Sequence, residues 1–384
     1  MALAGPAVVH LIVGSGDKHT GIGRYCTELH KRISRELPVR VCSFRKLPGA
    51  GRLSFLEHLP LGVEPDEGAG IYHFTRIMGC SLMLWRPLHP SVATVHDLGP
   101  LVCPEEAASV NAFDGLLLRL SLAGLKCSDR IVTRSEYTRQ TVCTHLRVDP
   151  QRVHVTPGGI DTERFRPIAG AKIWLAERYG LARDDGVYNL LYVGTEAPRK
   201  NLGVLLQSMA VLKRQHLAMR LLKVGGPGHP RARAALLAQI EELGLERDVL
   251  FLGAVADDEL PRLYSAADLV VLPSLMEGLG LPVLEGMACG SPVVCSDAGA
   301  LPEVAADAAV VVDPRDVQGL AEAIAAVAQN VDLRERLVQK GLHRVRGFSW
   351  AKTAGSTMLV YENVVLGQTH ATGGASDTPE ATIS

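Results

Sequence analysis

The sequence predicts an α/β protein with two doubly wound domains. Short apolar segments alternate along the chain with helical patterns, which is the order of βαβ units in a parallel sheet. These segments carry few polar residues, as expected of strands that are buried on both faces. The alternation stops in a polar, proline-containing passage at 161–187 and then restarts, and 384 residues exceed the length of one ordinary core.

The first domain is expected within residues 1–168. Helices are predicted at 23–33 and 111–126, where apolar residues recur at helical spacing. The expected strands are VVHLIVG (8–14), GIYHF (70–74), SVATVHD (91–97), RIVTRS (130–135) and VHVTPGG (153–159).

The second domain is expected within residues 169–347. Its first helix, 201–215, should begin with Asn201 as the N-cap. A last helix at 348–366 precedes a small, polar segment, 367–384, which has the composition of a disordered tail. The expected strands are NLLYVG (189–194), MRLLKVGG (219–226), VLFLG (249–253), ADLVVLPS (267–274), PVVCS (292–296) and AAVVVDP (308–314).

Composition excludes several classes of protein. Apolar residues make up 47% of the chain and charged residues 21%, with a formal net charge of −1, so no global charge attracts nucleic acid. The eight cysteines form no C-x-x-C pair, and a cytoplasmic location is therefore expected. The N-terminus lacks a basic signal-peptide region, and no apolar run reaches the roughly 18 residues of a membrane span. Neither an Asp-x-Asp nor another metal-ligand pattern is present, so no metal is expected.

One stretch, SLMEGLGLPVLEGMACGSPVV (274–294), has the pattern of a binding loop. Glu277 follows a predicted strand, and Glu285 lies eight positions later in a short helix that has Pro282 near its first turn. Both carboxylates can therefore border one cleft at the carboxyl end of a strand, where α/β proteins bind ligands. The flexible backbone at Gly278 and Gly280, together with the helix N-terminus, favours a phosphate nearby.

The chain resembles the retaining glycosyltransferases of the GT-B fold, family 4 in the usual classification, and especially the mannosyltransferases among them. Glu277-x7-Glu285 matches the signature of that family. The resemblance covers nearly all of residues 8–365 and implies two Rossmann-like domains that face each other across a cleft, with the last helix crossing back to the first domain. Further matching segments follow in the family's order: GIGRY (21–25), VHDL (95–98), SDRIVTRSEYTR (128–139), VTPGGIDTERFRP (155–167), VGTEAPRKNL (193–202) and ALPEV (300–304).

The resemblance also implies roles for residues of the second domain. Arg199 and Lys200 would stabilise the leaving diphosphate, because charged donors suit growing negative charge. The family often has an arginine at the position of Thr195, so Arg199 is expected to replace it. Glu285 would accept hydrogen bonds from the ribose and Glu277 from the donor sugar. The donor is also expected to lie against the backbone of Gly278, Leu279, Gly280 and Leu281.

In the first domain, the resemblance places His96 near the donor sugar and acceptor, with Asp97 shaping the acceptor side. The backbone at Gly21 and Gly23 would approach the diphosphate from across the cleft. Weaker candidates follow the strand at 130–135, where a structural role in a helix cap is the competing interpretation: Arg134, Ser135 and Arg139. The leucine-rich helix at 111–126 offers contact with lipid or a lipid-linked acceptor, although core packing is the favoured interpretation.

The expected function is a cytoplasmic, retaining hexosyltransferase, with contact at the inner face of the membrane left open. It would move mannose or glucose from a nucleotide sugar to a hydroxyl group of a glycan, a glycolipid or a small molecule. GDP-mannose is the first expected donor and UDP-glucose the second; either is a substrate, and no cofactor is expected. The alternatives are a non-hydrolysing nucleotide-sugar epimerase on the same fold and a non-catalytic nucleotide-sugar-binding protein.

Overall fold

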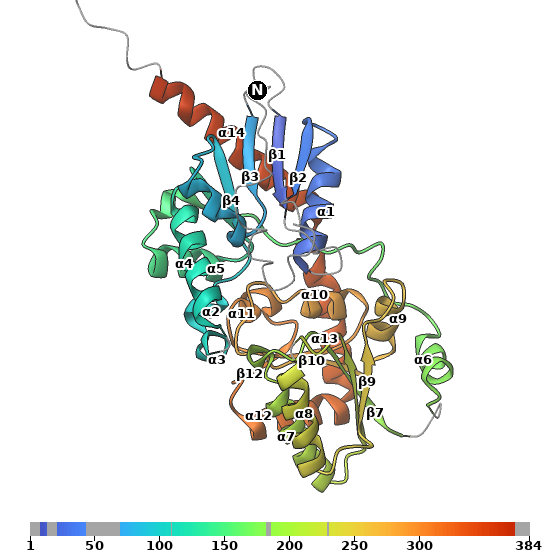
Figure 1. The fold of residues 1–384 in the computed structure, drawn as a ribbon. Helices are drawn as coiled ribbons and strands as arrows, with labels where there is room; N and C mark the ends of the chain where they lie inside the picture. The colour runs from blue at the N-terminus through green and yellow to red at the C-terminus, as the bar shows by residue number, and fades with distance from the viewer. Residues whose placement is uncertain are drawn as a thin grey trace, which may run out of the picture.

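The structure is a computed structural model that describes residues 8–13, 21–43, 70–108, 110–181, 186–228 and 230–372. Two parallel six-stranded sheets, each flanked by helices, confirm the predicted two-domain α/β fold (Figure 1). The strands of one sheet come from residues before 156, and those of the other come from residues after 187.

The first sheet has the order β2-β1-β3-β4-β5-β6. Its central strands are buried on both faces, which explains their continuous apolar sequence. The order reverses between β1 and β3, and such a reversal marks the point where doubly wound sheets bind ligands. The strands are β1 (Val8–Val13), β2 (Val39–Ser43), β3 (Gly70–Phe74), β4 (Ser91–Val95), β5 (Arg130–Thr133) and β6 (Val153–Val155).

Helices and shorter helical turns surround this sheet. Two long helices begin at side-chain caps: the Asn111 side chain accepts from Phe113 N and Asp114 N, and the Ser135 side chain accepts from Thr138 N. The helices and helical turns are α1 (Gly21–Ile33), η2 (Ile77–Leu84), α2 (Gly99–Val102), α3 (Pro104–Ala107), α4 (Ala112–Lys126), α5 (Glu136–Leu146) and η3 (Pro150–Arg152).

The second sheet has the order β12-β11-β10-β7-β8-β9, which reverses between β7 and β10. Its core is formed by apolar residues of these strands and of the helices on both faces. The strands are β7 (Tyr188–Val193), β8 (Met219–Val224), β9 (Val249–Gly253), β10 (Leu269–Leu272), β11 (Val293–Ser296) and β12 (Val310–Val312).

The helices of the second half connect these strands. Asn201 stands at the N-cap position of α7, as predicted, but its side chain makes no cap hydrogen bond. The elements are α6 (Ala171–Tyr179), η4 (Pro198–Lys200), α7 (Leu202–Arg214), α8 (Pro230–Glu242), α9 (Glu259–Ala266), α10 (Leu281–Ala288), α11 (Leu301–Ala305), α12 (Val317–Gln329), α13 (Val331–Arg344) and η5 (Val345–Gly347).

The last helix, α14 (Trp350–Thr372), returns to the first domain (Figure 1). It packs against α1, β4 and β5, and Trp350 and Tyr361 are buried in the core there. Residues 367–372, expected as the start of the tail, belong to this helix, whereas 373–384 lie outside the described residues. None of the described helices is both long and apolar enough to cross a membrane.

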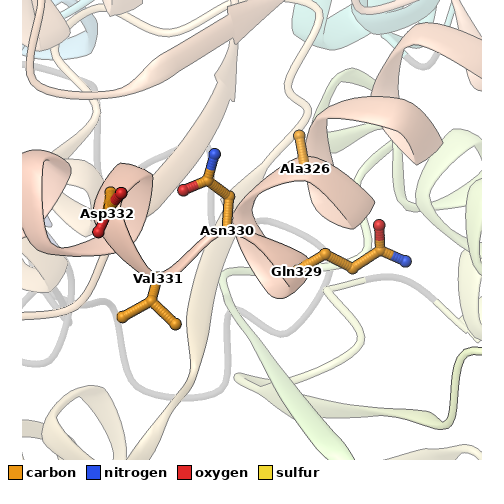
Figure 2. Close-up of a pocket in the computed structure, with 5 residues that line it drawn as sticks. All are labelled: Ala326, Gln329, Asn330, Val331 and Asp332. Atoms are coloured by element: carbon orange, nitrogen blue, oxygen red, sulfur yellow. The ribbon is translucent and has the colours of Figure 1, made fainter.

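A shallow hollow lies where α12 meets α13 (Figure 2). Asn330 joins the two helices in extended conformation, and its side chain accepts a hydrogen bond from Leu333 N at 2.9 Å, which caps α13. The hollow is lined by this turn alone and by none of the predicted site residues. It is therefore a feature of the helix junction.

Candidate active site

The predicted second-domain residues meet at the reversal of strand order, where the segments after β7 and β10 lie side by side. Lys200 Nζ donates to Glu277 Oε1 at 2.5 Å, and Ser274 Oγ donates to the same oxygen at 2.7 Å. Arg199 Nη1 lies 3.7 Å from Glu277 Oε2. Two backbone contacts fix this arrangement: Arg199 Nη1 donates to Met276 O at 3.1 Å, and Leu275 N donates to Arg199 O at 2.7 Å.

This cluster sets two cations against one carboxylate. Glu277 is 7% exposed, and burial opposes the charge on its carboxylate. Lys200 and Arg199 outweigh that effect and lower the pKa of Glu277 below its ordinary value. The carboxylate is therefore ionised at neutral pH, beside the two cations.

His96 and Asp97 of the first domain lie directly against this loop. A Cβ added to Gly278 would come within 1.9 Å of His96 O, so only glycine permits this approach. His96 Nε2 donates to Thr75 O at 2.9 Å, which leaves Nδ1 as the unprotonated nitrogen. Burial, together with the nearby charge of Arg134, lowers the pKa of His96 to about 3, so its ring is neutral. Asp97 Oδ1 accepts from Gly99 N at 3.1 Å and caps the first turn of α2.

The glycine-containing loop that leads into α10 bridges the two domains. Gly280 has a φ of 85°, which favours glycine, and α10 begins at Leu281 as predicted. Ser135 Oγ donates to Gly278 O at 2.8 Å, so a weaker candidate of the first domain contacts the loop. Leu279 packs on Gly158 across the junction. A Cβ on Gly21 would lie 3.3 Å from Leu281, which places the start of α1 at the same loop; Gly23 is buried in α1.

Glu285, in α10, also reaches the first domain. Arg24 Nη1 donates to Glu285 Oε1, and Tyr264 OH donates to Oε2 at 2.8 Å. The carboxylate is buried, whereas the Arg24 side chain is one quarter exposed. Both carboxylate oxygens of Glu285, the residue expected to bind the ribose, therefore accept hydrogen bonds within the protein. One of the donors is Arg24, a residue of GIGRY for which no role was predicted.

Comparisons with known proteins identify the family of this chain. Residues 66–164 match the family described as Glycosyltransferase Family 4, and residues 176–344 match Glycosyl transferases group 1. The O-antigen chain mannosyltransferase B of Escherichia coli is 31% identical over 379 residues, which cover 89% of this chain and 96% of that protein. This chain belongs to glycosyltransferase family 4.

Further relatives of this glycosyltransferase support the assignment. The MMP α-(1→4)-mannosyltransferase of Mycolicibacterium hassiacum is 29% identical over 308 residues, covering 77% of this chain and 71% of the relative. The sucrose-phosphate synthase of Thermosynechococcus elongatus superimposes with a TM-score of 0.74 at 22% identity, covering 94% of this chain and 100% of that structure. The fold of the glycosyltransferase is therefore GT-B.

Not every candidate residue of this glycosyltransferase lies at the Lys200–Glu277 cluster. Thr195 is exposed, its carbonyl accepts from Tyr192 OH at 2.9 Å, and its side chain lies near Gly228. Arg199, four positions later, is the arginine that faces Glu277. Arg139 donates to Val153 O and pairs with Glu136, so it serves the first domain itself.

Glu106 also contacts this cluster, although no motif in the sequence pointed to it. Its Oε2 lies 3.1 Å from Arg199 Nε, so α3 of the first domain is tied to the η4 turn. Burial raises the pKa of Glu106, with the charges of Asp97 and Glu277 adding to that effect and Arg199 and Lys200 opposing it. Arg199 is thus shared between carboxylates of the two domains.

A charge triad, with Lys223 and Glu196 buried and Arg233 partly exposed, supports the loop after β7. Lys223 Nζ lies 2.8 Å from Glu196 Oε1, and the Arg233 guanidinium pairs with the same carboxylate. Lys223 also donates to Gly225 O at 2.6 Å, which holds the turn after β8. An apolar strand with one lysine, MRLLKV, is the only sign of this triad in the sequence.

Arg134 is a buried cation beside this site. It is 5% exposed, and its Nε and Nη2 atoms have no hydrogen-bond partner. The guanidinium stacks on the rings of Tyr25 and Trp350, at 5.0 and 5.2 Å from their centroids. Burial lowers the pKa of Arg134 to about 10, so the group stays charged at neutral pH.

Among the described residues, no three His, Cys, Asp or Glu side chains are grouped as a metal site.

Proposed function

We propose that this glycosyltransferase is a retaining mannosyltransferase that transfers mannose from GDP-mannose to a hydroxyl group of a glycan, a glycolipid or a small molecule. The observation that carries the proposal is the Arg199–Lys200–Glu277 cluster at the strand reversal, which lies against His96 and Asp97 of the other domain. The two relatives named as mannosyltransferases favour mannose over glucose.

Arg199 and Lys200 are suited to hold the diphosphate. Negative charge grows on the leaving oxygen as the sugar–phosphate bond breaks, and preorganised cations stabilise that charge more than the ground state. In the structure both cations face Glu277. When they turn to the diphosphate, the Glu277 carboxylate is released to accept hydrogen bonds from the sugar hydroxyls.

Retention follows most simply from internal return. The acceptor oxygen bonds to the anomeric carbon on the face from which the phosphate oxygen departs, and the acceptor proton passes to that phosphate oxygen. Once Lys200 has turned to the diphosphate, Ser274 still donates to the buried Glu277 carboxylate, which therefore serves binding better than nucleophilic attack. Neutral His96 is suited to position a hydroxyl group without adding charge.

The test is a transfer assay with the full chain, a panel of mannosides and glucosides as acceptors, and either GDP-mannose or UDP-glucose as donor. Proton NMR of the product reads the anomeric configuration. We expect an α-mannoside from GDP-mannose, and little product from UDP-glucose. An inverted product would contradict retention. Conversion of the donor sugar without any acceptor would instead identify an epimerase.

A further inference from the structure

Helices α2, α3 and α4 lie at one side of the first domain (Figure 1), and their residues line a groove. It encloses about 430 Å³. Leu101 and Leu116 in its walls are 40% and 53% exposed, which is unusual for large apolar side chains that line one hollow. Its other apolar walls include Pro100, Val110, Leu118 and Leu122.

Among the described residues that line this groove, Arg119 alone is charged. It is exposed, and no ion pair or hydrogen bond to another described residue engages its guanidinium. The acids nearby have partners of their own: Glu105 pairs with Arg315, Glu106 with Arg199, and Asp114 accepts from Asn111. An apolar hollow with one available cation complements a molecule that has an apolar chain and an anionic group.

The helices α2 and α3 that line the groove also contact the candidate site. Its wall helix α2 begins two residues after Asp97, whose carboxylate caps Gly99. On the other side of the same wall, Glu106 of α3 contacts Arg199. A helix is about 10 Å across, so a single ligand can place a hydroxyl group beside His96 and its chain in the groove.

We propose that this groove binds the acceptor, and that the acceptor is an amphiphile whose alkyl chain fills the groove while its phosphate pairs with Arg119. This inference rests on the proposed function and adds the acceptor's chemical class to it. Each methylene that enters the groove should strengthen binding about fourfold, because burying one CH₂ removes apolar surface from water.

Calorimetry with the full chain tests the proposal without turnover. The probes are octyl, decyl and dodecyl phosphate below their micelle concentrations, with dodecyl maltoside and inorganic phosphate as the neutral and chain-free probes. The variants are Arg119→Gln and Leu116→Glu. Matched controls are Arg214→Gln and Leu237→Glu, exposed residues of α7 and α8 in the second domain. Melting temperatures of all four variants verify that they fold.

We expect affinity to rise about fourfold per methylene, and dodecyl phosphate to bind at least tenfold more weakly to Arg119→Gln and to Leu116→Glu than to the controls. In the transfer assay dodecyl phosphate should compete with the acceptor and not with GDP-mannose. Equal binding of dodecyl maltoside, binding of inorganic phosphate alone, or no effect of the two groove variants would overturn the proposal.

One further arm separates a membrane surface from a bound acceptor. If phosphatidylglycerol vesicles retain the protein through Leu116 and Arg119 while monomeric alkyl phosphates do not bind, the groove is a membrane contact and the proposal is wrong. If alkyl phosphates bind as expected but no donor is turned over, the groove stands and the proposed transferase function fails.

Discussion

Lys200 has a buried carboxylate as its partner in the structure, so its charge is already desolvated before any ligand arrives. Replacing it by alanine should lower kcat by about 10²–10³, because the charge that it meets grows only as the bond breaks. The dissociation constant of a neutral nucleoside should change little. Steady-state kinetics and calorimetry measure both, with Lys213→Ala as the control, since Lys213 pairs with Asp248 at the surface.

Full turnover by Lys200→Ala would place leaving-group stabilisation elsewhere, and Arg199 shared with Glu106 would become the first candidate. A loss in nucleoside affinity that equals the loss in kcat/KM would show a binding role without preference for the transition state.

Arg134 should lower the stability of the folded protein while it supports the transfer reaction. Its Nε and Nη2 groups are buried without acceptors, at a cost on the order of 1–3 kcal/mol that its stacking on Tyr25 and Trp350 offsets in part. Arg134→Met keeps the volume and removes the charge, so we expect about 1 kcal/mol of added stability together with reduced turnover. Chemical denaturation and the transfer assay test the two parts; a less stable variant with full turnover would make Arg134 a structural residue.

At the scale of single residues, the sequence predicted which residues form the cluster better than it predicted the side chains that contact them. Glu277, Lys200 and Arg199 meet as the family resemblance implied, although 77 residues separate Lys200 from Glu277. Arg24 and Glu106 contact the site through chain crossings that no local pattern encodes. Sequence spacing reports helical and strand neighbours only, so partners from the other domain had to come from the structure.

Among the elements, the loop before α10 is closely confined, because Gly278 lies against the backbone of His96, directly after β4. Gly278→Ala would place a methyl group 1.9 Å from His96 O and must push the two halves apart. We expect a loss of activity and a larger radius of gyration, with little change in circular dichroism. Gly355→Ala in α14 is the control, since nothing lies within 4 Å of the added Cβ. An active, compact Gly278→Ala would show that the contact gives way locally.

Helix α14 is fastened to the first sheet by a buried histidine. His73 Nδ1 lies 2.6 Å from Tyr361 Oη, and Nε2 lies 2.7 Å from Thr94 Oγ1. Burial lowers the pKa of His73 from 6.5 to about 3. The unfolded chain therefore takes up a proton below pH 6.5 while the folded protein does not. The contribution of neutral His73 to the free energy of unfolding is fully present above pH 6.5. It is lost as the pH falls toward 3, at up to about 1.4 kcal/mol per pH unit.

His73→Gln should remove this part of the pH dependence, because glutamine does not titrate. Free energies of unfolding at pH 7, 6 and 5 measure it, with the exposed His343→Gln as control. We expect wild type and control to lose stability in parallel on acidification and His73→Gln to lose less. Equal slopes for all three proteins would contradict a neutral His73 in the folded state.

Strands that are buried on both faces could be predicted from the sequence, whereas elements with an exposed face were harder to predict. β2 (Val39–Ser43) escaped prediction because it is an edge strand with Val41 49% exposed and an arginine at its second position, so its sequence is not an apolar run. α6 lies within the polar passage that was expected to link the domains. Asn201 stands where it was expected, but in a left-handed conformation, and its side chain donates instead to Pro273 O and Pro314 O.

For the molecule as a whole, the Arg24–Glu285 pair joins the two domains at the expected ribose site. A nucleotide ribose must therefore compete with Arg24 for the carboxylate or share it. Arg24→Met should shift the protein toward an open form with a larger radius of gyration by small-angle scattering, and saturating GDP should reduce that difference. Arg32→Met is the control, because Arg32 pairs with Glu28 within α1. Identical scattering from both variants would show that the Arg24–Glu285 pair does not hold the two domains together.

The two places where the chain passes between the domains lie together, since Ile160 and Ser349 form an isolated parallel bridge and Gly159 lies against Trp350. Two separated crossings would allow only rotation about the line through them. Adjacent crossings act as one pivot, and the far rim of each domain then travels farther than residues beside it for the same angle. The geometry acts as a lever: small changes of torsion near Gly159 produce displacements that grow with distance from this pivot, and they separate Glu106 of α3 from Arg199 of η4.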